Sequence, residues 1–120
     1  MKGSTTILIL SLLEKEDLYG YQIIQKLSIS SDNIFNLKEG TLYPLLHGLE
    51  NDDAIFAYWV ETKEGRNRKY YKITKIGRNL LKEKQAEWKI FSETVNKVID
   101  SVDSADSVEM RGGGKVEYAY

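Results

Sequence analysis

The sequence predicts a mainly α-helical domain with one small β-hairpin, followed by a long C-terminal helix. Three observations support this fold class. Apolar residues recur at helical spacing in the first half of the chain, two β-branched and aromatic segments flank a polar turn near the middle, and a heptad-like stripe runs through residues 81–102. With 120 residues the chain is long enough for one domain with a modest core.

Composition excludes several classes of protein. The hydrophobic share of 42% and the charged share of 29% are typical of a soluble globular protein. The absence of cysteine excludes disulfides and thiolate metal sites. No segment approaches the length of a membrane-spanning helix, and the apolar run at 7–13 lacks the cleavage site of a signal peptide. We therefore expect a cytoplasmic protein with no membrane partner.

Positive charge is concentrated in one segment although the net charge is only −1. Residues 1–59 hold four Lys and Arg against eight Asp and Glu, whereas residues 60–84 hold nine against three. Salt confines each patch's field to roughly 8 Å, so the local excess matters more than the total. The segment fits a nucleic-acid contact, and a solvated basic face is the alternative. Its cations are Lys63, Arg66, Arg68, Lys69, Lys72, Lys75, Arg78, Lys82 and Lys84.

The first two elements are expected to be helices. Ile7–Leu13 is apolar nearly all round, which predicts a helix buried on more than one side, with Ser4, Thr5 or Thr6 as its cap. The charged residues 14–17 end it. Apolar residues at helical spacing then predict a second helix over Tyr21–Ser30, followed by a polar turn at residues 30–33.

A third helix is expected to begin near Glu39. Its apolar stripe recurs at intervals of 3, 4 and 7 residues and consists of Leu42, Leu45, Leu46 and Leu49. Away from the stripe lie Thr41, Tyr43, His47 and Glu50, all able to form hydrogen bonds. Pro44 is expected in the first turn or so, and Gly40 can either turn the chain sharply or let a partner's backbone approach closely. Two helices joined by a turn form a helix-turn-helix pattern.

A hairpin follows, with predicted strands over residues 54–62 and 68–74 and Gly65 at a positive φ in the turn. A hairpin after a helix-turn-helix is a wing. Four cations within seven residues at its tip can reach phosphates or a minor groove, and a merely soluble tip would not need them: Lys63, Arg66, Arg68 and Lys69. Tyr70 and Tyr71 should point to opposite faces, one into the core and one toward DNA.

The last predicted helix begins after a Thr74 cap and carries a heptad seam at Leu81, Lys84, Trp88, Phe91, Val95, Val98 and Val102. From residue 75 to 102 such a helix would run about 42 Å. A body of about 75 residues has a radius of gyration of only about 11–12 Å, so the far half needs a cover. A second copy is the simplest one, which predicts a homodimer. The domains are then a winged helix-turn-helix at 1–74, a dimerisation helix at 75–103 and a flexible tail at 104–120.

Catalytic and metal chemistry have no support in the sequence. His47 is the only histidine and has no cysteine to share a metal site. A serine nucleophile would need His47 as its base, with no predictable carboxylate to orient it. We expect no enzyme, metal or cofactor.

The motifs also resemble a known family. Glu39-Gly40-Thr41-Leu42-Tyr43-Pro44-Leu45-Leu46 and Arg68-Lys69-Tyr70-Tyr71-x-x-Thr74, in this order and spacing, look like the PadR family of bacterial transcriptional regulators, in its smaller subfamily with a single C-terminal helix. The resemblance covers about residues 7–102. It implies a dimeric winged-helix repressor of a palindromic operator, often released by a phenolic, other aromatic or multidrug-like effector. Asp53 stands where the family usually has a glycine.

These considerations assign candidate residues. Tyr43 has a rival role in packing against the wing, and Trp88 could fill the dimer core instead of lining an aromatic effector slot with Phe91. A dimeric ligand-binding or protein-interaction module without operator binding is the alternative function. The candidate DNA contacts are Tyr19, Gln22, Lys38, Thr41, Tyr43, His47, Lys63, Arg66, Arg68, Lys69 and Tyr71. The candidate dimer contacts are Leu8, Leu12, Leu81, Trp88, Phe91, Val95, Val98 and Val102.

Overall fold

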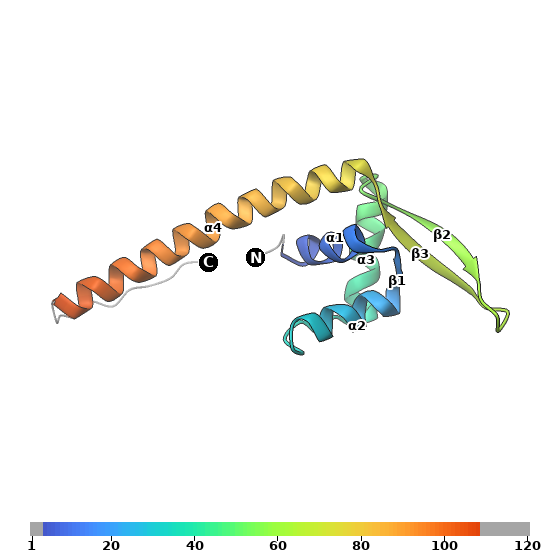
Figure 1. Ribbon diagram of the computed structural model, residues 1–120, viewed down its shortest axis with the longest axis horizontal. Helices are drawn as coiled ribbons and strands as arrows, with labels where there is room; N and C mark the ends of the chain where they lie inside the picture. Colours follow the sequence, from blue (N-terminus) through green and yellow to red (C-terminus); the bar gives the residue numbers. More distant parts are fainter. Residues whose placement is uncertain (1–3, 109–120) are drawn as a thin grey trace. The chain divides into compact units, whose positions relative to one another are not determined.

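Four helices and three strands make up the computed structural model, which describes residues 4–108 (Figure 1). In chain order they are α1 (Ser4–Lys15), β1 (Leu18–Tyr19), α2 (Gly20–Ser30), α3 (Glu39–Asn51), β2 (Ile55–Glu61), β3 (Asn67–Ile73) and α4 (Lys75–Val108). The chain divides into two units, Met1–Ala86 and Glu87–Tyr120. Helix α4 continues past residue 103, where the tail was expected to begin, and the rest of that expected tail lies outside the described residues.

The core of the first unit is built from every element in it, which confirms the mainly helical fold with a small sheet. The leucine stripe of α3 is buried as predicted, with Leu45 half-buried at its margin. Helix α1 buries one face, and Leu8 and Leu12 stay half-exposed. Thr5 and Thr6 lie inside α1 and do not cap it. The buried hydrophobic residues are Ile9, Leu10, Leu13, Leu18, Ile23, Leu27, Leu42, Leu46, Leu49, Ala54, Ile55, Tyr71, Ile73 and Leu81.

The sheet has three antiparallel strands in the order β1-β3-β2. The hairpin β2–β3 was predicted within one residue at each end, and Gly65 in its turn has φ +80° as expected. Strand β1 was not predicted. Its residues Leu18 and Tyr19 pair with Tyr71 and Tyr70 of β3, so the start of α2 is attached to the base of the hairpin.

The structure defines the positions of Pro44 and Gly40 in α3 more closely than the sequence does. Pro44 is the sixth residue of the helix and lies in its second turn, where its missing N–H leaves the carbonyl of Gly40 without its usual donor. Gly40 has no positive φ and sits in the first turn, so it does not bend the chain. A Cβ at Gly40 would meet no described atom within 4 Å, which leaves that side of the helix open.

The end of α3 and the start of α4 are closed by specific contacts. The N–H of Asp53 donates to Glu50 O (3.0 Å) and that of Ala54 to Leu49 O (2.9 Å), with Asp53 at φ +57°. At the other helix, Thr74 Oγ1 accepts from the N–H of Gly77 (3.0 Å), which confirms the predicted cap.

Candidate nucleic-acid interface

The polar face of α3 is open to solvent. Thr41, Tyr43 and His47 are exposed outside the buried leucine stripe of the helix. Lys38 is the exposed N-cap residue, in an extended conformation. Because Glu39 begins the helix directly after it, Lys38 and the first turn of α3 offer hydrogen-bond donors to one region of solvent.

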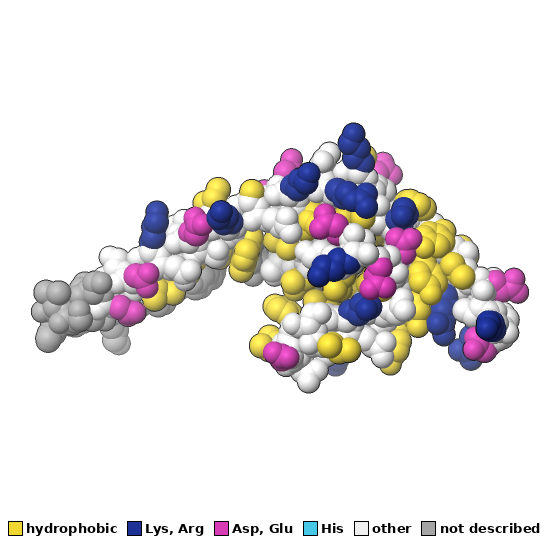
Figure 2. All heavy atoms as spheres, in the orientation of Figure 1, with side chains coloured by type: hydrophobic (Ala, Val, Ile, Leu, Met, Phe, Trp, Pro, Cys, Tyr) yellow, Lys and Arg dark blue, Asp and Glu magenta, His cyan; other side chains and the backbone are white. Residues whose placement is uncertain are grey.

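The tip of the hairpin carries two unengaged cations. Lys63 and Arg66 are exposed, and within the described chain their side chains make no hydrogen bond or ion pair. The turn itself is ordered by Thr62, whose N–H and hydroxyl both donate to Arg66 O. Figure 2 shows Lys and Arg side chains gathered toward this tip, with acidic side chains among them. The two cations are therefore free to meet an external anion.

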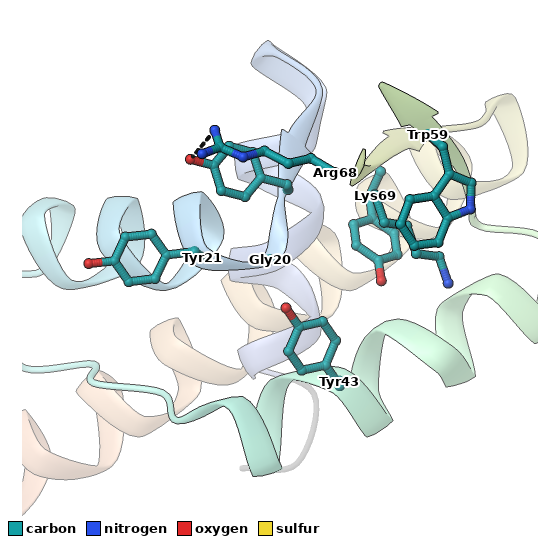
Figure 3. Close-up of a pocket in the computed structure, with 8 residues that line it drawn as sticks. Gly20, Tyr21, Tyr43, Trp59, Arg68 and Lys69 are labelled. Carbon is teal, nitrogen blue, oxygen red and sulfur yellow. Dashed lines mark hydrogen bonds between the residues drawn. The ribbon is translucent and has the colours of Figure 1, made fainter. Parts of the chain in front are cut away.

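Arg68 is held back along the hairpin by Tyr19. Its Nη1 donates to Tyr19 Oη (3.0 Å), and its guanidinium lies 4.6 Å from the centre of the Tyr19 ring (Figure 3). Gln22 is also engaged, because its Oε1 accepts from the N–H of Tyr19 (3.2 Å) and so caps α2. These contacts bring three of the predicted DNA-binding residues together at the start of α2.

Lys69 and Tyr71 face α3. Lys69 Nζ lies 3.5 Å from Glu50 Oε1 and 5.6 Å from the centre of the Tyr71 ring. Tyr71 is only 2% exposed and belongs to the core, and burial together with the nearby Glu50 and Tyr43 raises its pKa to about 12. The expectation that Tyr71 reaches DNA was therefore wrong. The alternation of the strand instead points Tyr70 to the opposite face.

A groove of about 340 Å³ separates α3 from the hairpin and the start of α2. In Figure 3 Tyr43 rises from α3 with its hydroxyl toward Gly20, and Trp59 and Lys69 descend from the hairpin. A Cβ at Gly20 would lie 2.3 Å from Tyr43 Oη, so the absence of a side chain there gives the phenol its place. Tyr43 thus packs over the start of α2 and remains 42% exposed.

Sequence reasoning missed two aromatic residues of this groove. Trp59 is 65% exposed and stands opposite Lys69 in the strand register, and Tyr21 is 54% exposed in the first turn of α2. The alternation of β2 could have placed Trp59 on the same face as Ala57, but only the register shows that it stands beside Lys69. Both aromatic side chains add planar surface beside the polar face of α3.

In the second unit α4 exposes an apolar stripe. Trp88, Phe91 and Val98 are 42%, 45% and 52% exposed, and the rings of Trp88 and Phe91 lie 5.8 Å apart. Val95 and Val102 on the same side of the helix are half-buried. Leu81 differs from these residues because it is completely buried in the core of the first unit. Its assignment to a dimer interface was therefore wrong.

A comparison with protein families decides the identity. The sequence profile of the transcriptional regulator PadR-like family matches residues 9–83. The chain belongs to this family. It is accordingly a DNA-binding transcriptional regulator with a winged-helix fold, and PadR-like proteins are generally not enzymes. The match covers all of the elements that carry the polar face of α3 and the wing cations.

Solved PadR-like structures agree with this fold. A transcriptional regulator from Clostridium thermocellum superposes with a TM-score of 0.75 at 36% identity, over 80% of this chain and 93% of that one. A PadR-like transcription factor from Bacteroides fragilis gives 0.69 at 46% identity, over 81% and 91%. An uncharacterized protein from Lysinibacillus sphaericus is 35% identical over 103 residues, which is 86% of this chain and 94% of its own. Among the described residues, none of the helices is both long and apolar enough to span a bilayer.

Proposed function

We propose that this PadR-like regulator is a cytoplasmic repressor that binds a palindromic operator as a homodimer. The observation that carries the proposal is the placement of exposed polar residues of α3 and exposed wing cations on the same compact unit. A duplex offers these two surfaces complementary targets, because a major groove admits a helix while the flanking phosphates attract the cations. A repressor is the activity that the family resemblance implies.

Each group of residues has a proposed role. The α3 residues Lys38, Thr41, Tyr43 and His47 face the major groove, with Lys38 on a phosphate. The wing residues Lys63, Arg66, Arg68 and Lys69 meet phosphates or the minor groove. Tyr19 and Gln22 lie at the N-terminus of α2 and contact the DNA phosphates, because the partial positive charge of this helix end favours anions.

Two copies are proposed to associate through α4. Its exposed stripe would otherwise leave Trp88, Phe91 and Val98 in water, and burial of such a side chain is worth roughly 1.5–3 kcal/mol. The half-exposed Leu8 and Leu12 of α1 are proposed as separate dimer contacts. In this division residues 1–74 read DNA, and the exposed part of residues 75–103 joins the subunits.

The first experiment measures DNA affinity against salt. A duplex from upstream of the protein's own gene should be shifted, with log affinity falling by roughly 0.9 per neutralised phosphate for each unit of log salt. Arg66→Ala combined with Arg68→Ala should make this slope less steep by the amount expected for the loss of about two phosphate contacts. A slope equal to that of the wild type would remove the wing from the interface. A protein that ignores duplex DNA would instead favour the alternative, a dimeric ligand-binding or protein-interaction module.

An aromatic effector is proposed to bind between the subunits, stacked on Trp88 and Phe91. Trp59 lines the protein groove between α3 and the hairpin, and its fluorescence would add to that of Trp88. The test therefore uses a Trp59→Phe background, in which Trp88 is the only tryptophan. A planar aromatic compound that acts as an effector should quench Trp88 and weaken the DNA shift at the same concentrations. Quenching without any change in DNA affinity, or no quenching, would indicate that Trp88 only fills the dimer core.

A further inference from the structure

We propose that Asp17 is a positioning residue that holds the β2–β3 hairpin at the angle in which its cations reach DNA. Asp17 lies at the end of the α1–β1 connection, and no role was expected for it beyond ending a helix. The inference rests on the proposed function in one respect, namely that the hairpin contacts DNA. It adds a group that does not itself touch the duplex.

The carboxylate of Asp17 bridges both strands of the hairpin. Tyr58 of β2 donates its hydroxyl to Asp17 Oδ2 (2.5 Å), and Lys72 Nζ of β3 lies 3.7 Å from Asp17 Oδ1. The hydrogen bond to Asp17, with burial and the carboxylate's charge, raises the pKa of Tyr58 to about 12, so the phenol remains a donor well into the alkaline range. A single side chain from the helical body therefore anchors each of the two strands.

The contact continues along one face of the sheet. Tyr70 and Arg68 are two residues apart on β3, so they point to one side of that strand, and Tyr58 stands opposite Tyr70 in the register. The ring of Tyr70 lies 5.4 Å from that of Tyr19 and 5.8 Å from that of Tyr58. Arg68 then reaches back to Tyr19 Oη. Asp17 is thus connected through three tyrosines to a cation of the wing.

The hairpin needs such an anchor because β1 supports little of it. Strand β1 pairs only with Tyr70 and Tyr71, so beyond these residues the hairpin is a two-stranded ribbon (Figure 1). An isolated two-stranded ribbon is marginally stable and twists strongly. The Asp17–Tyr58 bond lies beside the last three-stranded pair, since Tyr58 stands opposite Tyr70. It can therefore fix the direction in which the free part of the hairpin leaves the body.

The expected change in DNA affinity of an Asp17 variant is opposite to the change that simple electrostatics predicts. Removing an acidic group near a DNA-binding face ordinarily strengthens binding, because it removes repulsion from the phosphates. Asp17→Ala should instead weaken DNA binding by about tenfold, and its salt slope should fall by roughly 1–2, as expected when wing cations lose phosphates. Glu64→Gln is the matched control: Glu64 is exposed at the wing tip, and its neutralisation should leave affinity equal or higher.

A double-mutant cycle tests whether Asp17 acts through Tyr58. Tyr58→Phe removes the hydroxyl but keeps the ring that stacks on Tyr70, and it should reproduce the loss of affinity. The double variant should then bind no more weakly than the weaker single variant. Asp17→Asn keeps an oxygen that can accept the hydrogen bond, so it should recover part of the affinity. Additive losses, or tighter binding by Asp17→Ala, would overturn the proposal.

A measurement without DNA separates this inference from the proposed function. Amide hydrogen exchange in the hairpin of Asp17→Ala and Tyr58→Phe should accelerate by about tenfold, while the amides of α1 and α2 should exchange as in the wild type. Unchanged exchange in the hairpin would refute the positioning role even if DNA binding falls. If the wild type binds no duplex, the proposed function fails, and the exchange data alone decide whether Asp17 orders the hairpin.

Discussion

Two helical glycines, Gly77 and Gly48, differ in whether a side chain would fit at their positions. Gly77 needs to lack a side chain, because a Cβ there would lie 2.0 Å from the carbonyl oxygen of Ala54 and 2.8 Å from Ile73 Cγ1. Gly48 is also helical, yet a Cβ there would meet no described atom within 4 Å. The same substitution should therefore have opposite effects at the two positions.

Gly77→Ala should lower the free energy of unfolding by about 1–3 kcal/mol, because the contact with Ala54 involves backbone and cannot relax cheaply. Gly48→Ala should raise it by about 0.5–1 kcal/mol, because alanine loses less backbone entropy in a helix. Urea denaturation of both variants at one protein concentration measures the two values. Destabilisation by both substitutions would show that Gly48 has a packing role that its open surroundings do not indicate.

At the scale of elements, α3 ends in a motif that usually requires glycine. The two crossed hydrogen bonds from Asp53 and Ala54 place Asp53 in the left-handed region at φ +57°, which costs a residue with a Cβ roughly 1–2 kcal/mol. The aspartate also adds negative charge at the negative end of the helix dipole. The resemblance to the PadR family had identified this position as a departure, and the structure gives its backbone conformation.

Asp53→Gly should accordingly stabilise the protein by about 1 kcal/mol. Asp52→Gly is the matched control, because Asp52 has φ −87° and gains nothing from a glycine. Thermal or urea unfolding of both variants distinguishes the conformational effect from the loss of an acidic charge, which the two share. Equal stabilisation by both would assign the gain to charge alone.

The predictable elements were those with a clear periodicity. The 3.6-residue spacing of leucines predicted α3, and the two β-branched and aromatic segments on either side of the polar turn at Gly65 predicted the hairpin and its cations. Strand β1 was not predicted because two residues are too few to show a hydrophobic periodicity, and they form a strand only through pairing with β3. Because β1 was not predicted, the role of Asp17 and the contact between Arg68 and Tyr19 were not predicted either. Tyr71 was misassigned because alternation separates two faces without saying which one is buried.

At the scale of the whole chain, the seam of α4 shows a similar limit. Its repeat of 3 and 4 residues runs unbroken from Leu81 to Val102, but the repeat does not state what each residue packs against. Leu81 is buried in the first unit, whereas Trp88, Phe91 and Val98 are exposed in the second. Only this later part of the seam is available to a second subunit.

The proposed dimer can be tested at that later part. Phe91→Asp and Val98→Asp place a carboxylate in the stripe, and burying an unpaired charge costs far more than the apolar contact supplies. Each variant should sediment as a monomer at micromolar concentration, should keep its hairpin and core folded, and should bind a palindromic duplex much more weakly than the wild type. Glu93→Lys changes an exposed residue on the opposite side of the same helix and should remain dimeric. A wild-type protein that is already monomeric, or aspartate variants that still bind the whole operator as tightly, would mean that the stripe serves another partner.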